Sequence, residues 1–281
     1  LRCWLPEATL RGSKQAGLYE SWRRAGVLTV TPGAVFASGA AYAKALYELR
    51  QRKGVSMQAA MDMVHDPTIC GLMMVQTGDA DGFVGGMYRA YPETIRPAIQ
   101  ILGLKPGTSR VSAAHILVLK DRIFFCADTM VNIQPTAEEL AETAILTAQY
   151  ARHFDLEPRV AMLSFSNFGS AEHPLTTKVK RATALVKQMD PNLIVDGEVQ
   201  ANVALDPELV EKQFPFSKLK GNANCFIFPD LQSGNIAYKL LHKLGGAETV
   251  GPILMGMKKP VHVLQRGDDV SEIVNMAAVA V

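Results

Sequence analysis

The stretch that decides the fold is RVAMLSFSNFGSAEHPLTTKVKRATALVKQM, residues 159–189. It joins a short apolar run to a polar loop and then to a segment whose apolar residues recur at helical spacing. Two similar units follow, in which LIVDG precedes DPELVEKQ and CFIFPD precedes LQSGNIAYKLLHKLG. Apolar strands that alternate with amphipathic helices form right-handed crossovers and a mainly parallel sheet covered on both faces. The pattern therefore predicts an α/β protein.

The segments that precede this stretch predict further elements. We expect helices over AAYAKALYELRQRKG (40–54), SMQAAMDMVHDP (56–67), PETIRPAIQILG (92–103) and PTAEELAETAILTAQYARHFD (135–155). The last of these begins with a capping box from Thr136 to Glu139. LMMV (72–75) is expected to be a strand that leads into the turn GDADG, and SAAHILVLK with DRIFFCADTMVN (112–132) a hairpin.

Composition excludes several classes of protein. The chain has 281 residues, 48% of them hydrophobic and 20% charged, which predicts a globular protein of two domains or one large α/β unit with an inserted lobe. A net charge of +2 without a basic stripe argues against nucleic-acid or membrane-surface partners. No run approaches the about 20 apolar residues of a membrane helix. We expect a cytoplasmic protein with reduced cysteines and no metal site, because the Cys and His residues are scattered.

Residues 1–36 are atypical. They show no steady period and do not begin with Met. We interpret this segment as a fragment of a longer polypeptide, an artificial junction or a first lobe without a recognisable pattern.

Residues directly after the predicted strands are the candidates for chemistry, because ligands bind beyond the carboxyl ends of parallel strands. Hydroxyl, amide and glycine residues there suit a phosphate at a helix N-terminus. Any one of them alone is better explained as a helix cap, but three such loops at one edge of a sheet favour a ligand cleft. Most carboxylates are expected to be solvated or to cap helices. The candidates that follow strands are Ser164, Ser166, Asn167, Gly169 and Ser170; Asp196 and Glu198; Asp230, Ser233 and Asn235; Asp79 and Asp81.

Several motifs together resemble one family. GDADGFVGG, TIRPAIQ, PTAEELAE, RVAMLS, ANCFIFPDLQSGNIAYKLLHKLGGAETVGPILMGMKKPV and IVNMAAVAV are similar to the phosphate acetyl/butyryltransferase family over about Val35 to Val281. SFSNFGS, LKGNAN and KKPVHVL look more like the C-terminal domain of bacterial hybrid NADP-dependent malic enzymes.

The resemblance implies a fold of two three-layer α/β/α lobes with mainly parallel sheets and a cleft between them, similar to isocitrate and isopropylmalate dehydrogenases. We expect the first lobe to comprise residues 1–98 and 253–281, and the inserted second lobe residues 99–252.

The resemblance also points to site residues. Family members carry N-D-L-S-R-G after KPV, where Ser, Arg and a later Asp serve acetyl transfer between coenzyme A and phosphate. Here Gln265 replaces the Ser, Arg266 matches, and Glu272 stands for the Asp. A misplaced catalytic group can cost on the order of a hundredfold in rate, so we expect little transfer. The residues expected to bind acetyl-CoA or phosphate are Ser166, Asn167, Gly169, Ser170, Asp230, Asn235, Arg266, Arg96 and Arg89.

These considerations imply a regulatory domain of a hybrid malic enzyme that binds acetyl-CoA as an allosteric inhibitor and supports self-association. It would carry no cofactor itself, with NADP and a divalent metal confined to N-terminal malic-enzyme domains of the parent chain. An active phosphate acetyltransferase is the alternative, motivated by Arg266 and Glu272. A purely structural dimerisation module is a third hypothesis, and a dehydrogenase is the weakest.

Overall fold

The computed structural model describes residues 3–4, 32–87, 89–120, 122–265, 267–268 and 270–280, and side chains only from residue 39 onward. The chain forms two compact units, Leu1–Pro106 with Met257–Val281 (unit 1) and Gly107–Gly256 (unit 2). The expected lobe boundaries, at 98/99 and 252/253, lie inside a helix and a strand of these units. The atypical segment 1–36 falls largely outside the described residues.

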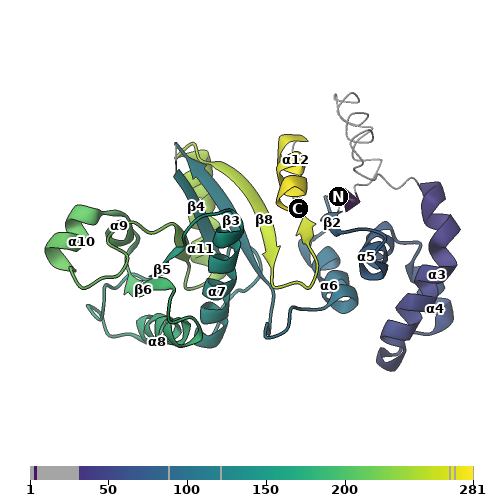
Figure 1. Ribbon diagram of the computed structural model, residues 1–281, viewed down its shortest axis with the longest axis horizontal. Helices are drawn as coiled ribbons and strands as arrows, with labels where there is room; N and C mark the ends of the chain where they lie inside the picture. Colours follow the sequence, from purple (N-terminus) through teal and green to yellow (C-terminus); the bar gives the residue numbers. More distant parts are fainter. Residues whose placement is uncertain are drawn as a thin grey trace. The chain divides into compact units, whose positions relative to one another are not determined.

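Unit 1 consists of helices around a short parallel sheet (Figure 1). Strand β2 pairs in parallel with β1 on one side and β9 on the other, with Phe83 opposite Val261. Leu46, Leu72, Met73 and Phe83 are fully buried in it. Its elements are β1 (Cys3–Trp4), α3 (Pro32–Arg50), η1 (Gln51–Lys53), α4 (Met57–Met63), α5 (Pro67–Thr77), β2 (Gly82–Gly85), α6 (Tyr91–Leu102), β9 (Val261–Val263) and α12 (Val270–Val279).

The strand expected at 72–75 is wrong, because these residues lie in helix α5. Asp66 caps the helix by accepting hydrogen bonds from two backbone N–H groups, Pro67 occupies its first turn, and Gly78 ends it in the left-handed conformation. Every residue from Thr68 to Val75 is buried. A helix buried on all sides has no polar face, so its apolar run cannot be told from a buried strand by periodicity.

Unit 2 is a three-layer α/β/α sandwich. Its strand order is β8-β3-β4-β7-β5-β6, in which β4, β7, β5 and β6 run parallel and β3 pairs antiparallel with β4 and β8. The elements are β3 (Ser112–Leu119), β4 (Arg122–Ala127), α7 (Ala137–His153), β5 (Arg159–Leu163), α8 (Pro174–Met189), β6 (Ile194–Val199), α9 (Ala201–Leu205), α10 (Pro207–Gln213), β7 (Cys225–Ile227), α11 (Leu231–Lys243) and β8 (Glu248–Met255).

The hairpin, the strand–helix alternation and the mainly parallel sheet are confirmed in unit 2. The predicted capping box of α7 is present, since Thr136 accepts from the Glu139 N–H while the Glu139 carboxylate accepts from the Thr136 N–H. Sequence reasoning missed β8, whose first half is only partly buried. It also placed Asp196 and Glu198 in a loop, whereas β6 continues through both of them.

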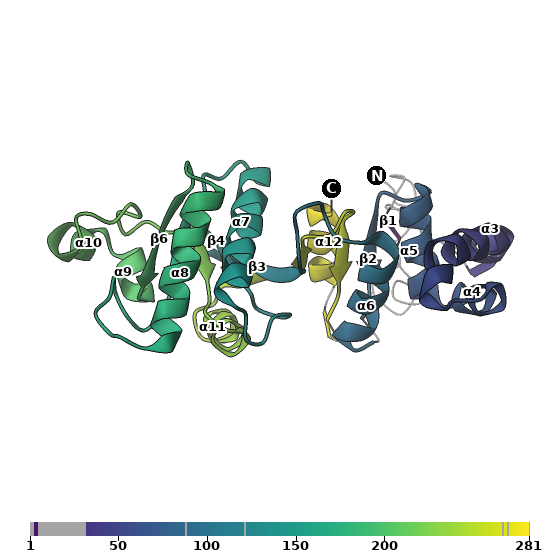
Figure 2. The same ribbon diagram turned by 90° about the horizontal axis from the view of Figure 1, so that it is seen from below.

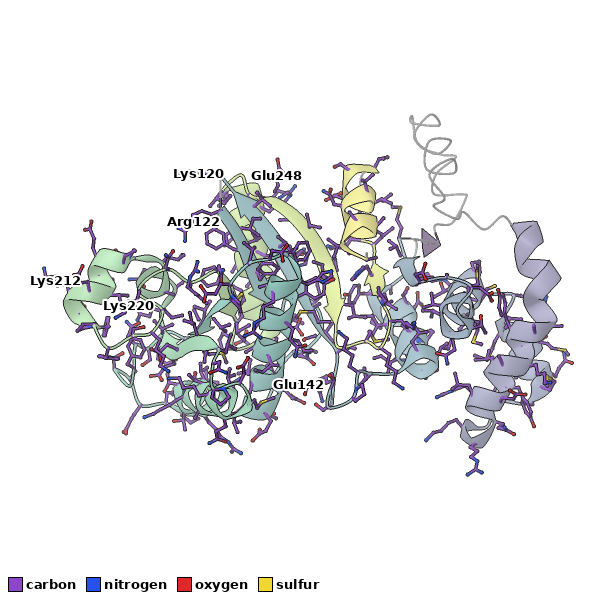
Figure 3. All side chains as sticks on the ribbon, in the orientation of Figure 1. Lys120, Arg122, Glu142, Lys212, Lys220 and Glu248 are labelled. Carbon is purple, nitrogen blue, oxygen red and sulfur yellow. The ribbon has the colours of Figure 1, made fainter. Side chains whose placement is uncertain are left out.

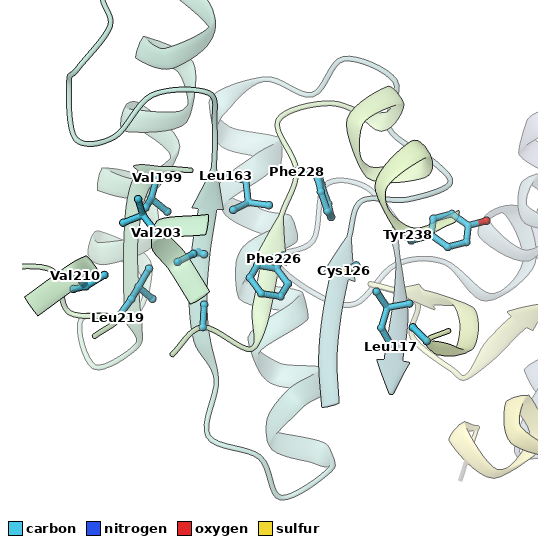
Figure 4. Packing of buried hydrophobic residues seen from close by; sticks show 14 residues of the cluster. Leu117, Cys126, Leu163, Val199, Val203, Val210, Leu219, Phe226, Phe228 and Tyr238 are labelled. Atoms are coloured by element: carbon cyan, nitrogen blue, oxygen red, sulfur yellow. The ribbon is translucent and has the colours of Figure 1, made fainter. Parts of the chain in front are cut away.

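Alternation of side chains along the strands builds the two faces of the unit 2 sheet. Cys126, Ala161 and Phe226 lie in register on neighbouring strands and pack with residues of α9, α10 and α11 (Figure 4). Phe125 lies on the alternate face, where its ring is 6.0 Å from that of Phe154 beside α7. Helices α7 and α8 pack side by side on that face (Figure 2).

Helix α11 packs closely against the chain after β4 at Gly234. A Cβ atom at this position would lie 2.3 Å from the carbonyl oxygen of Asp128. We expect Gly234→Ala to lower the free energy of unfolding by about 1–3 kcal/mol, the usual cost of overpacking, as measured by urea denaturation. Gly39→Ala is the matched control, because nothing lies within 4 Å of a Cβ there. It should stabilise α3 by about 0.5–1 kcal/mol. Equal effects of the two variants would contradict the close approach.

Candidate functional site

The carboxyl ends of β2 and β9 lie side by side at one edge of the unit 1 sheet. The Leu264 N–H donates to the Gly85 carbonyl oxygen over 2.8 Å, which extends the pairing to the point where both strands end. Gly86 follows with φ +97°, and a Cβ there would lie 2.8 Å from atoms of Thr94 and Val263. The close fit requires glycine at this turn.

Several residues named from the sequence follow these two strands. Gln265 follows β9 after one residue, and its N–H donates to the Asp268 carboxylate over 2.6 Å. Glu272 lies in the first turn of α12 and is partly buried. Arg266 lies outside the described residues. Helices α6 and α12 both begin after strands that end at this edge, and helix N-termini attract anions.

The two arginines of this region differ in their surroundings. Arg89 forms an ion pair with Asp66 over 2.7 Å, and its side chain is 39% exposed. Asp66 in turn accepts from the Thr68 and Ile69 N–H groups at the start of α5. Arg96 is exposed on α6. The binding of acetyl-CoA or phosphate by either arginine stays a prediction. Arg89 would have to bind the ligand with a guanidinium that already pairs with Asp66.

In unit 2 the loop between β5 and α8 wraps around one buried carboxylate. Glu198, at the end of β6, is 2% exposed, and its Oε1 accepts from the Gly169 N–H over 2.5 Å and the Ser166 hydroxyl over 3.1 Å. The Ser166 oxygen also accepts from the Ala171 N–H. Ser170 accepts from the Asn167 N–H, and Asn167 Oδ1 accepts from the Gln200 N–H. Tertiary pairing thus brings the four loop residues named from the sequence together around Glu198.

Sequence reasoning expected most of the candidate carboxylates to be solvated or to cap helices, whereas Asp196 and Glu198 are buried in β6. In the β6 sequence IVDGEV, Asp196 and Glu198 are both buried, and each accepts hydrogen bonds from its own set of donors. The Lys187 ammonium and the Lys218 N–H donate to Asp196. A buried charge is tolerated only when hydrogen bonds or a counter-charge compensate its lost hydration, and both carboxylates meet this condition.

Asp230 and Asn235 hold the backbone near the start of α11. The Asp230 carboxylate accepts from the Ser233 N–H over 2.8 Å and caps the helix. The Asn235 amide donates to the Thr129 carbonyl over 3.0 Å. Asp128 precedes Thr129 in the chain and is buried. Its pKa is raised because burial outweighs its hydrogen bonds from residues 130–132. The Asp230 and Asn235 side chains therefore form hydrogen bonds with backbone groups. Their proposed contacts with a ligand stay predictions.

No group of three or more His, Cys, Asp or Glu residues within the described residues could hold a metal ion. No helix in the described part of the chain is long and apolar enough to cross a membrane.

Comparison with protein families decides where this chain belongs. Residues 15–281 match the family model described as phosphate acetyl/butaryl transferase. The chain belongs to this family. Phosphate acetyltransferase of Nitratidesulfovibrio vulgaris is 44% identical over 238 residues, which cover 85% of this chain and 34% of the relative. That of Clostridium acetobutylicum is 40% identical over 247 residues, which cover 85% of this chain and 74% of the relative.

Solved structures of the phosphate acetyl/butaryl transferase family share the fold. A phosphotransacetylase from Staphylococcus aureus superposes with a TM-score of 0.87 at 31% identity, covering 100% of this chain and 93% of the other. The chain spans only about a third of the length of the Nitratidesulfovibrio relative, 34%. The α/β/α fold class expected from the sequence is confirmed.

These comparisons overturn the first hypothesis about function. The relatives that match over 85% of the chain bear the name phosphate acetyltransferase, so the reading as a regulatory domain of a hybrid malic enzyme is wrong. The associated expectations of an oxidoreductase, of NADP, of allosteric acetyl-CoA inhibition and of malic-enzyme partner domains fall with it. That the chain itself carries no cofactor stays a prediction.

Two buried histidines make the free energy of unfolding depend on pH. Burial lowers the pKa of His262 in β9 from 6.5 to about 4, and burial with nearby Lys239 and His242 lowers that of His115 to about 3. The unfolded imidazoles bind protons below pH 6.5 that the folded ones do not. Stability is therefore fully present above pH 6.5 and lost as the pH falls toward 4.

Urea denaturation from pH 7.5 to 4.5 measures this effect. His262→Leu should flatten the dependence of unfolding free energy by up to about 1.4 kcal/mol per pH unit below pH 6.5. Val261→Ala, in the same buried strand, should lower stability equally at every pH. An unchanged slope in His262→Leu would contradict the buried neutral imidazole.

Proposed function

We propose that this protein is a phosphate acetyltransferase, which moves an acetyl group between coenzyme A and inorganic phosphate. The observation that carries the proposal is 40–44% identity to proteins of that name over 85% of the chain. The likeness to a phosphotransacetylase structure over the whole chain supports it. In one direction the coenzyme A thiolate attacks the carbonyl carbon of acetyl phosphate, the bond to the phosphate oxygen breaks, and phosphate leaves.

The edge of the unit 1 sheet offers groups suited to this chemistry. The reaction needs a base for the thiol proton and positive charge for the phosphate. By resemblance to the family motif, Glu272 is proposed as the base and Arg266 as the phosphate-binding guanidinium. The Gln265 amide is proposed to donate to the carbonyl oxygen, the position where relatives carry the shorter Ser hydroxyl. The N-terminus of α12, where Glu272 lies, supports the binding of anions nearby.

Formation of acetyl-CoA from acetyl phosphate and coenzyme A, followed by thioester absorbance, tests the activity. We expect turnover by the 281-residue chain and release of one phosphate per thioester formed. No thioester formed from acetyl phosphate and no acetyl phosphate formed from acetyl-CoA would contradict the proposal, provided that the protein shows a cooperative unfolding transition.

Glu272→Gln tests the proposed base. Because the amide cannot accept the thiol proton, kcat should fall by about 10²–10⁴, and the dependence of kcat on pH should flatten. Glu272→Asp keeps the carboxylate and should retain part of the pH dependence. Glu211→Gln, exposed on α10, is the control and should leave kcat unchanged. A fall in kcat in Glu272→Gln that leaves the wild-type pH profile unchanged would indicate a structural role instead.

A further inference from the structure

Beyond the loop around Glu198, unit 2 contains a cavity of about 370 Å³. Its walls come from the loop at Gly169 and Ala171, from one face of α8, and from Glu198 at the end of β6. The volume falls within the about 300–1,000 Å³ of small-molecule sites. An inorganic anion or an amino acid would leave most of it to water.

Glu198 faces this cavity with half of its hydrogen-bonding capacity unused. Oε1 accepts from Gly169 and Ser166, whereas Oε2 accepts no hydrogen bond from any described residue. The side chain is 2% exposed and lines the cavity. Because Glu198 lines the cavity, its Oε2 can accept a hydrogen bond from an N–H or O–H group of an occupant.

Cations lie on the α8 wall of the same cavity. Lys180 and Arg181 line it two turns into the helix, and Thr177 adds a hydroxyl. Arg181 is paired with Glu138 on α7, which leaves Lys180 as the more available charge. Glu172 is a second carboxylate in the lining. The cavity therefore combines an acceptor, small apolar walls at Gly169, Ala171 and Ala184, and a cationic wall.

We propose that this cavity binds an adenine nucleotide, whose exocyclic amino group donates to Glu198 and whose phosphate lies against Lys180. A flat purine fits between walls of small residues, and the nucleotide fills a cavity of this size. Two sources share this chemistry, a free nucleotide such as AMP and the nucleotide end of coenzyme A. Only the second rests on the proposed transferase function.

Calorimetric titration of AMP and IMP into the full chain tests the proposal. IMP carries an oxo group in place of the amino group and should bind at least about tenfold more weakly, because it presents an acceptor to Glu198. Glu198→Gln keeps the oxygen that Gly169 and Ser166 bind, so its amide N–H₂ must face the cavity. This variant should weaken AMP binding by about 10- to 100-fold and reverse the preference between AMP and IMP.

Lys180→Ala should weaken both nucleotides several-fold without changing their ratio. The matched control is Lys212→Ala on α10 (Figure 3). Lys212 does not line the cavity, so this variant should leave binding unchanged. No saturable AMP binding at millimolar concentration, or binding that Glu198→Gln leaves unaltered, would overturn the proposal.

Competition identifies the source of the nucleotide. If coenzyme A displaces AMP from the wild type but not from Glu198→Gln, the occupant is the nucleotide end of the substrate. If both bind together, the cavity is a separate nucleotide site. An active enzyme that does not bind AMP overturns this inference alone, and an inactive chain that binds it overturns the proposed function alone.

Discussion

Parallel pairing of β5 with β6 on one side and β7 on the other makes three strands of unit 2 end at one edge of the sheet. Each chain segment that leaves this edge must satisfy its backbone N–H groups away from the ladder. Glu198 does this for the loop after β5, because its carboxylate accepts from Gly169 and its backbone oxygen accepts from Phe168. The conformation of this loop and one wall of the cavity therefore depend on the Glu198 carboxylate.

In unit 1 the loops after the strands are held by other groups. Its strands β2 and β9 are short, and the loops after them are held by Gly86 in a left-handed turn and by the Asp268 carboxylate on the Gln265 N–H. The helices that follow these strands begin at the same edge. Helix N-termini therefore lie at the edge of the unit 1 sheet, whereas a carboxylate and cationic side chains line the cavity of unit 2.

Gln265 and Glu272 differ from the Ser and Asp of the family motif, and the comparison with relatives changes how these differences are interpreted. Taken alone, a longer amide in place of a hydroxyl and one extra methylene on the acid argue for lost catalysis. The similarity over 85% of the chain to proteins named phosphate acetyltransferase supports the proposal that transfer is retained. The local frame around Gln265 is built from backbone hydrogen bonds, which a different side chain at this position can share.

Much of the fold could be read from residue spacing. The amphipathic helices α7, α8 and α11, the hairpin of β3 and β4, and the capping box at Thr136 follow from local periodicity and capping chemistry, which neighbouring residues determine by themselves. The helix α5 could not be read in this way, because burial on every side removes the polar face that distinguishes a helix from a strand.

The site residues divide along the same line. The sequence by itself determined that Ser166, Asn167, Gly169 and Ser170 form a loop after a parallel strand. Only the tertiary structure decided that this loop closes on Glu198, 29 residues beyond Gly169 in the chain, and that the Asp230 and Asn235 side chains form hydrogen bonds with backbone groups. Burial and hydrogen-bond partners depend on which strands become neighbours, and strand order is a property of the whole chain that local spacing does not encode.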